Sequence, residues 1–162
     1  MFRGTEQSIF DSQSPVLVNP VNCVGVMGAG LALSFKQQFP QIEAPYRKAC
    51  QTGELCIGRP LWIPVAHRWV VCLPTKHDWR QPSTLNYVRL ALRGLVIGMR
   101  ERHLTSVSLP AIGCGLGGLS WDDVQLEIRQ AFEGSDATVW VHPPKGRRWE
   151  KGDGCGLTST MS

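Results

Sequence analysis

The sequence lacks the features of membrane and secreted proteins. No apolar run reaches the length of a transmembrane helix, and the N-terminus has no signal-peptide hydrophobic region. The six cysteines form no C-x-x-C pair and no Cys/His zinc spacing, so we expect reduced thiols and no bound metal. Only 19% of the residues are charged and 43% are hydrophobic, which excludes an intrinsically disordered chain. These features predict a cytoplasmic globular protein.

Several catalytic signatures are also missing. There is no G-x-G-x-x-G dinucleotide fingerprint and no Gly-Lys-Ser/Thr of a P-loop, which disfavours hydride transfer and ATP hydrolysis. The four histidines are scattered, without H-x-x-x-H spacing or an inferable Ser–His–Asp arrangement. The net charge of +4 lies partly in a basic C-terminal segment. That charge is a weak indication of nucleic-acid binding, and a solvated surface explains it equally well.

The length of 162 residues suits one domain, in which predicted strands and helices alternate. Ser83 and Ser120 are predicted helix N-caps, the second within a capping box. This order predicts an α/β fold with a largely parallel sheet. We assign 1–142 to the domain and 143–162, which is rich in Pro, Gly and charge, to a flexible tail. Strands are predicted at 15–18, 60–65, 69–73, 106–109 and 138–141, and helices at 29–39, 44–51, 83–103 and 120–132.

Two glycine-rich loops follow predicted buried strands. The first is VLVNPVNCVGVMGAG (16–30) and the second is SVSLPAIGCGLGG (106–118). Glycine lets backbone N–H groups approach an anion closely, and the first loop runs into a helix N-terminus, which favours phosphate. In open parallel sheets, ligands bind at the carboxyl ends of the strands. The loops therefore predict a pocket for a nucleotide diphosphate, the alternative being that the glycines only form tight turns.

Asn19 and Asn22 flank a Pro-Val pair in the first loop. An amide side chain can donate and accept hydrogen bonds at once, which suits ribose hydroxyls. Either side chain could instead satisfy backbone groups of its own loop. We expect Asn22 to be the stronger candidate for ligand contact.

Three motifs occur in order: NPVNCVGVMGAGLA, LPTKHDWR and LPAIGCGLGGLSW. Together they resemble the macrodomain family, and in particular the branch that contains the DarG-type DNA ADP-ribosyl glycohydrolases and the terminal ADP-ribose glycohydrolase. The resemblance extends from about residue 5 to residue 141. It implies a three-layer α/β/α sandwich with a mixed, mostly parallel sheet, which binds ADP-ribose without a metal or another cofactor.

The resemblance also implies roles for individual residues. Lys76 and Asn22 match the residues associated with glycohydrolysis. A lysine beside an opening ribose can polarise its oxygens or attack C1″ as an amine, whereas its alternative role is a solvated cation or a phosphate counter-charge. The residues expected to bind ADP-ribose are Ser8, Ile9, Asn19, Asn22, Gly25, Val26, Met27, Gly28, Ala29, Gly30, Thr75, Trp79, Gly113, Cys114, Gly115, Leu116, Gly117 and Gly118.

Two positions depart from the pattern of related macrodomains. Gly117 and Gly118 stand where the hydrolase acting on acidic side chains has an aspartate, which favours the DNA-acting branch. Ser8 stands where many macrodomains have the aspartate that receives the adenine amino group. These departures imply chemistry without a Lys–Asp pair and weaker selection of adenine.

Aromatic and thiol side chains near the loops have two interpretations. Trp79 could stack on adenine or on a DNA base, or it could anchor its loop. Trp121 is expected to pack at a helix start. Cys23 and Cys114 are expected to be tolerated small side chains rather than nucleophiles.

The favoured hypothesis is an enzyme that releases ADP-ribose from a modified macromolecule, foremost DNA modified at thymidine. One alternative is a non-catalytic reader of ADP-ribose or another NAD-derived nucleotide, and another is a hydrolase of small ADP-ribose derivatives. A general nucleic-acid-binding module ranks last. The expected partners are ADP-ribosylated substrates, DNA and an ADP-ribosyltransferase toxin, and no membrane.

Overall fold

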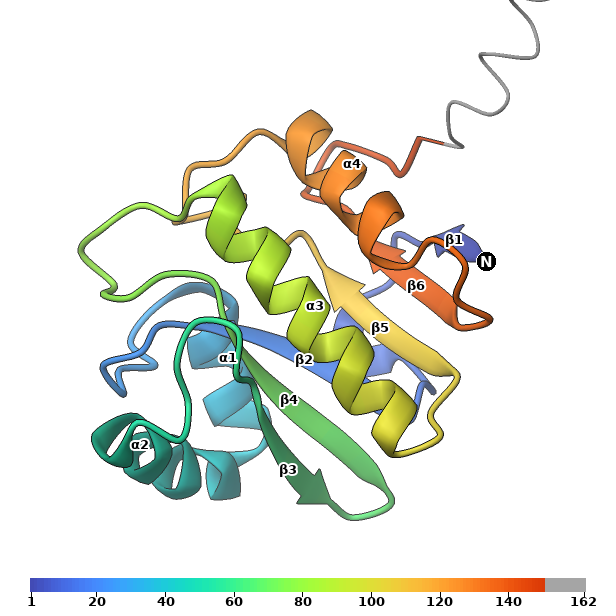
Figure 1. The fold of residues 1–162 in the computed structure, drawn as a ribbon. Coiled ribbons are helices and arrows are strands. Elements are labelled where there is room, and N and C mark those ends of the chain that lie inside the picture. The colour runs from blue at the N-terminus through green and yellow to red at the C-terminus, as the bar shows by residue number, and fades with distance from the viewer. Residues whose placement is uncertain (151–162) are drawn as a thin grey trace, which may run out of the picture.

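The computed structural model describes residues 1–150, which form a six-stranded sheet between two layers of helices (Figure 1). Residues 151–162 lie outside the described part of the chain. The strands are β1 Phe2–Gly4, β2 Val16–Val21, β3 Leu61–Val65, β4 Arg68–Pro74, β5 Ser106–Pro110 and β6 Thr138–His142. The helices are α1 Gly30–Gln38, α2 Glu43–Thr52, α3 Leu85–Glu101 and α4 Trp121–Ala131, with 3₁₀ turns at Ile9–Asp11 and Pro40–Ile42.

The strand order in the sheet is β1-β6-β5-β2-β4-β3. All neighbouring strands run parallel except β3, which forms an antiparallel pair with β4. This arrangement confirms the predicted mixed, mostly parallel sheet. Because β2 and β5 are neighbours, the two glycine-rich loops that follow them emerge side by side at the same edge.

Alternating side chains of the strands build two hydrophobic cores. In β2, Val16 and Val18 pack on the face covered by α3 and α4, and Leu17 packs on the face covered by α1 and α2 (Figure 1). Successive strand residues point to opposite faces, so a fully apolar strand requires a helix layer on each side. The structure thus has the three layers expected of the α/β/α sandwich.

The predicted caps of two helices are wrong in detail. Helix α3 begins at Leu85, and Thr84, not Ser83, is its N-cap, with its hydroxyl accepting a hydrogen bond from the Tyr87 N–H at 3.1 Å. Ser83 instead donates its backbone N–H to the Gly117 carbonyl. Ser120 does precede α4, but its side chain makes no capping hydrogen bond, so the capping box does not form.

The predicted domain boundary at residue 142 is also wrong, because 143–150 pack on the domain. Trp149 is only 8% exposed and joins the core beneath α4. The Trp121 indole N–H donates to the Arg148 carbonyl at 3.0 Å, and the Glu150 N–H donates to Gln125 Oε1 at 2.8 Å. The rest of the predicted tail lies outside the described residues.

The short strand β1 had no counterpart in the sequence prediction. It pairs in parallel with β6, placing Phe2 beside Val139. Three residues without apolar alternation give no strand pattern, and the pairing partner lies more than 130 residues away, so only the tertiary fold creates this strand.

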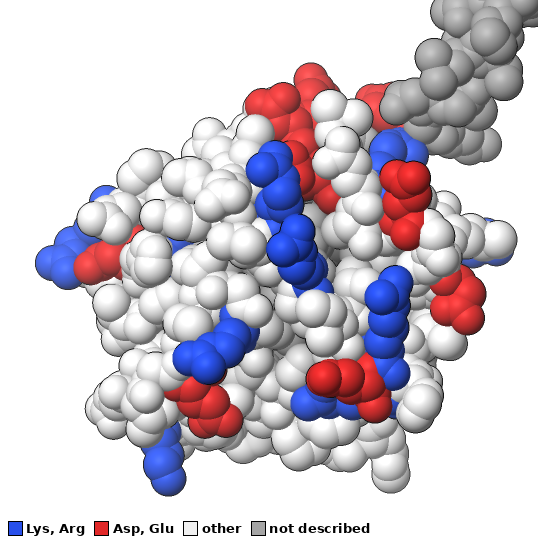
Figure 2. Space-filling model, viewed as in Figure 1, with Lys and Arg blue, Asp and Glu red and all other residues white. Residues whose placement is uncertain are grey.

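Charges on the face formed by α3 and α4 are mixed, with Lys and Arg side chains interspersed among Asp and Glu (Figure 2). Arg89 and Glu127 form a bidentate pair there, with distances of 2.9 and 2.8 Å. This face does not resemble the continuous basic surface expected of a general nucleic-acid-binding module. No helix among residues 1–150 combines the length and apolarity needed to cross a bilayer.

Candidate functional site

A cavity of about 1160 Å³ opens at the carboxyl ends of β2, β4, β5 and β6. Both glycine-rich loops line it, together with Lys76 from the end of β4. Aspartate and glutamate are absent from its described lining, whereas Lys76, Lys145 and Arg147 contribute to it. The cavity therefore favours an anionic ligand. The lining includes these predicted site residues: Ser8, Ile9, Asn22, Val26, Gly28, Ala29, Gly30, Thr75, Lys76, Trp79, Gly113, Cys114, Gly115, Leu116 and Gly117.

Four predicted binding residues do not line the cavity: Asn19, Gly25, Met27 and Gly118. Asn19 is fully buried within β2, where its Nδ2 lies 4.0 Å from Cys72 Sγ and its Oδ1 has no partner among the described residues. Met27 is likewise buried in the core under α1 and α2. Asn19 and Met27 are buried and do not line the cavity, so the structure does not support the direct contacts expected of their side chains.

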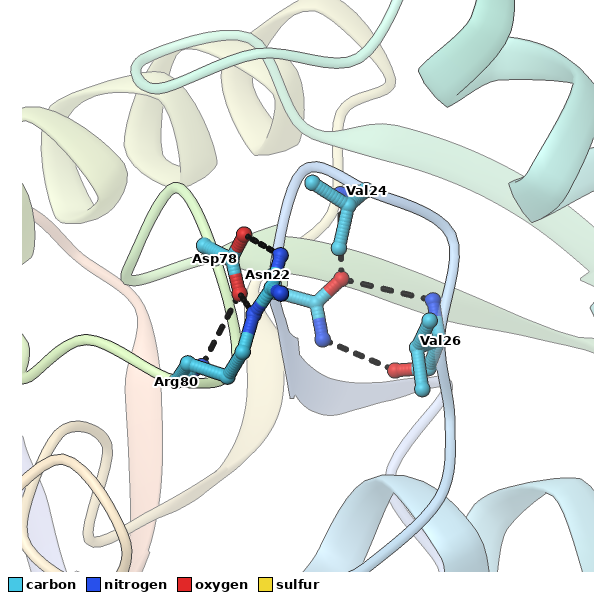
Figure 3. Close-up of polar contacts among 5 residues, drawn as sticks. All are labelled: Asn22, Val24, Val26, Asp78 and Arg80. Carbon is cyan, nitrogen blue, oxygen red and sulfur yellow. Dashed lines mark hydrogen bonds and ion pairs between the residues drawn. The ribbon is translucent and has the colours of Figure 1, made fainter.

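Asn22 organises the first loop through its side chain (Figure 3). Its Nδ2 donates to the Val26 carbonyl at 2.8 Å, and its Oδ1 accepts from the backbone N–H groups of Val24 and Val26 at 3.1 and 3.4 Å. The buried Tyr46 hydroxyl also reaches Asn22 Oδ1 and the Asn22 carbonyl, each at 2.8 Å. The amide oxygen is therefore occupied. The amide nitrogen makes one hydrogen bond and has a second N–H to offer, and Asn22 lines the cavity.

Two helix N-termini open onto the cavity without a side-chain cap. Helix α1 follows Ala29 and contributes Gly30, Leu31 and Ala32 to the lining, and α4 contributes Trp121. The first N–H groups of a helix have no intrahelical partner and carry a partial positive charge. Gly30 adopts φ +59°, a left-handed conformation that admits the close turn into α1. Two such helix ends facing one space can bind both phosphates of a diphosphate.

The second glycine loop is closely packed at Gly117. A Cβ there would lie 2.5 Å from both the Gly113 carbonyl oxygen and Ser83 Oγ. Any side chain at this position, a carboxylate included, would displace the loop backbone. The geometry thus explains why glycine occupies position 117, one of the two positions at which the resemblance implies an aspartate in the hydrolase of acidic side chains.

Lys76 is only 8% exposed and lines the cavity beside Thr75. The six ion pairs found among residues 1–150 do not include it. The interpretation as a solvated surface cation is therefore wrong. A lysine held in a cavity without a carboxylate partner is available to a bound anion or to an opening sugar.

The segment 77–83 forms a strap between the two glycine loops. At one end the Cys23 N–H donates to the His77 carbonyl at 2.9 Å, and at the other the Ser83 N–H donates to the Gly117 carbonyl at 3.1 Å. In between, Arg80 Nε and Nη2 donate to the two carboxylate oxygens of Asp78 at 2.9 and 2.7 Å (Figure 3). These hydrogen bonds lower the pKa of Asp78 to about 2, so it stays ionised.

The β6 end of the cavity contains residues that the sequence prediction missed. His142 Nδ1 lies 2.9 Å from the Gln7 carbonyl and therefore donates to it, which leaves Nε2 as an acceptor without a partner among the described residues. Burial lowers the pKa of His142, which favours the neutral imidazole. Because ligands bind at the carboxyl ends of parallel strands, the end of β6 could have been predicted as part of the site. The residues missed here include Gln7, Phe10, His142, Pro143, Pro144, Lys145 and Arg147.

The thiols near the cavity are not activated. Burial is the main cause that raises the pKa of Cys23 and of Cys114 to about 11, so both are protonated at neutral pH. The five cysteines within residues 1–150 are all free, and Cys155 lies outside that range. No group of three or more metal-ligating side chains occurs in the described part of the chain.

Comparison with known proteins identifies the family to which this chain belongs. The Macro domain model matches residues 18–127. A DNA ADP-ribosyl glycohydrolase of Thermus aquaticus is 40% identical over 152 residues, covering 89% of this chain and 41% of that protein. A DNA ADP-ribosyl glycohydrolase of Mycobacterium tuberculosis is 39% identical over 140 residues, covering 83% of this chain and 40% of that protein. The chain thus spans about two-fifths of the length of these curated relatives.

Solved structures show the same fold. The macrodomain of Mycobacterium tuberculosis DarG has a TM-score of 0.86 at 37% identity, covering 90% of this chain and 99% of that one. Thermosipho africanus DarTG in complex with ADP-ribose has a TM-score of 0.84 at 30% identity, covering 91% of this chain and 42% of that one. With the family model, the sequence relatives and the three-layer fold in agreement, the chain belongs to the macrodomain family.

Proposed function

We propose that this macrodomain binds ADP-ribose and hydrolyses the bond that joins it to a nucleic acid, foremost ADP-ribosylated thymidine in DNA. The observation that carries the proposal is one cavity with two uncapped helix N-termini, a buried lysine and no carboxylate in its described lining. The helix ends suit the diphosphate of ADP-ribose. The names of the relatives, DNA ADP-ribosyl glycohydrolases, support the acceptor.

The reaction breaks the bond between C1″ of the distal ribose and the base. Water supplies the oxygen that bonds to C1″, and the released base takes up a proton. Ordinary glycosidases use two carboxylates, one as acid and one as nucleophile or base. Because the described lining supplies neither, we assign the task of stabilising the opening sugar or transferring the proton to Lys76, the lysine that the motif resemblance associates with glycohydrolysis. The second N–H of the Asn22 amide orients the ribose.

The functional partner and the cellular location of this protein are also proposals. A Thermosipho africanus relative, 33% identical over 162 residues, is a DNA ADP-ribosyl transferase-DNA ADP-ribosyl glycohydrolase fusion protein, which supports functional pairing with a transferase that makes the modified DNA. The free cysteines among residues 1–150 support a reducing compartment such as the cytoplasm.

The test is release of ADP-ribose from a single-stranded oligonucleotide that carries ADP-ribosyl-thymidine. We expect turnover by the wild type and a loss of about 100-fold or more in kcat for Lys76→Ala, with little change in affinity for free ADP-ribose. Lys48→Ala, an exposed lysine of α2 outside the cavity, is the matched control and should keep full turnover. Tight binding of ADP-ribose without any release would contradict the glycohydrolase and identify a reader.

A further inference from the structure

An exposed indole stands at the mouth of the cavity. Trp79 lines the cavity and is 53% exposed. Val26 and Leu116, from the first and second glycine loops, are exposed apolar residues of the same lining. Burying a tryptophan is favourable, so an exposed one at the rim of a cavity, accompanied by apolar side chains from two other loops, indicates a contact surface.

The strap 77–83, which carries this indole, is hydrogen-bonded along its length. Its ends are hydrogen-bonded to the two glycine loops, through the His77 carbonyl and the Ser83 N–H. Its centre is fixed by the bidentate Asp78–Arg80 pair (Figure 3), and the Arg80 guanidinium carbon lies 5.3 Å from the centre of the Trp79 ring. A preorganised aromatic side chain loses little conformational freedom when a ligand stacks on it.

The strand order fixes which part of the substrate meets Trp79. From β4 the sheet runs through β2 and β5 to β6, a distance of three strand spacings or about 14 Å. The glycine loops follow the two middle strands, Lys76 follows β4, and His142 ends β6. A diphosphate bound between the loops, with its reacting sugar at Lys76, directs its nucleoside toward His142. Trp79, three residues beyond Lys76, therefore lies on the side from which the acceptor leaves.

We infer that Trp79 is the platform on which the acceptor nucleobase stacks, and that it, rather than the ADP-ribose pocket, selects nucleic-acid-linked substrates. This inference rests on the proposed function. Asp78 neutralises the Arg80 charge, which weakens attraction to phosphate and leaves the flat indole and guanidinium as the recognition surface. Stacking on an aromatic ring tolerates every base, because each base has a π-face. A substrate whose acceptor is an acyl group or a phosphate has no base that could stack on this surface.

The experiment compares two substrates in three proteins. The substrates are an oligonucleotide carrying ADP-ribosyl-thymidine and an acylated ADP-ribose, which has no acceptor base. The proteins are the wild type, Trp79→Ala and Trp140→Ala. Trp140 is the matched control, because it is 37% exposed, lies 5.8 Å from the Arg3 guanidinium and does not line the cavity. We expect Trp79→Ala to lower kcat/KM for the oligonucleotide about 5- to 100-fold more than for the acyl substrate. Trp140→Ala should affect neither.

Binding gives a second readout that does not need turnover. In Lys76→Ala protein, the modified oligonucleotide should bind more tightly than free ADP-ribose, and adding Trp79→Ala should remove that excess affinity. Equal losses for both substrates, or an excess affinity that survives Trp79→Ala, would overturn the inference. Absence of wild-type turnover would count against the proposed function alone, because the Trp79-dependent excess affinity would still be measurable.

Discussion

Substitution of Gly117 by alanine tests how closely the second glycine loop is constrained. The added Cβ would lie 2.5 Å from the Gly113 carbonyl oxygen and from Ser83 Oγ, about 0.9 Å inside the ordinary contact limit of 3.4 Å. The carbonyl belongs to the backbone of the loop and cannot rotate away, so the loop itself has to shift. Forced overpacking of this kind costs about 1–3 kcal/mol. For a chain of this size, that corresponds to a melting temperature roughly 2 to 12 °C lower.

The assay is thermal unfolding followed by calorimetric titration with ADP-ribose. Because the shifted loop lines the cavity, we expect the Kd of Gly117→Ala to rise about 10-fold or more. Gly115→Ala is the control for stability, since a Cβ at Gly115 would meet nothing within 4 Å. It should change the free energy of unfolding by no more than about 0.5 kcal/mol. If the two variants unfold at the same temperature, the close packing described for Gly117 is incorrect.

Changes at Tyr46, His142 and Asp78 test other contacts of the site. Tyr46→Phe removes the buried hydroxyl that donates to Asn22, and it should lower the free energy of unfolding by about 1–2 kcal/mol. It should also lower kcat/KM, and by a larger factor than it lowers the affinity for ADP-ribose. Unchanged values would show that this bond does not position Asn22. Burial lowers the pKa of His142 in the folded protein below its usual 6.5. As the pH falls, the unfolded chain therefore binds a proton at this residue before the folded protein does. The stability that neutral His142 contributes is thus present above pH 6.5 and is lost as the pH falls. Melting curves from pH 5 to 7.5 should show this decline, and His142→Gln should reduce its slope; an equal slope in both proteins would exclude His142 as its source. Asp78→Asn weakens the pair with Arg80 and should reduce turnover of the DNA-linked substrate. The melting temperature should stay nearly unchanged, because Arg80 is exposed and Asp78 is only partly buried; a large drop in melting temperature would indicate a structural role instead.

The sheet and most helices could be predicted because their physical causes are local. The apolar run at 16–18 requires a helix layer on each side, and helix ends follow from nearby Pro and Gly. Strand β1 could not be predicted, since its three residues become a strand only by pairing with β6. Trp149 likewise becomes buried only because it packs beneath α4. The composition of its segment, rich in Pro, Gly and charge, gives no sign of this packing.

The parts of the candidate site in which backbone geometry requires glycine could be predicted from the sequence. The parts in which burial determines whether a side chain reaches the cavity were harder to predict. The two loops and Lys76 came from motifs, and the structure places them around one cavity. Asn19 and Asn22 are the same residue type three positions apart, yet one lies inside the sheet and the other at its edge. That difference depends on where β2 ends, which the chain alone does not determine to within a residue or two. His142 was missed because its role depends on the Gln7 carbonyl, from the opposite end of the chain.

In the proposed complex the two glycine loops hold the diphosphate of ADP-ribose, with its distal ribose at Asn22 and Lys76. A crystal structure of the complex with ADP-ribose tests this most directly. We predict the two phosphates at the N-termini of α1 and α4, the adenine toward His142 and the distal ribose C1″ facing Lys76. A ligand bound in the reverse direction, with adenine at Lys76, or one bound outside the loops would contradict the proposed binding mode.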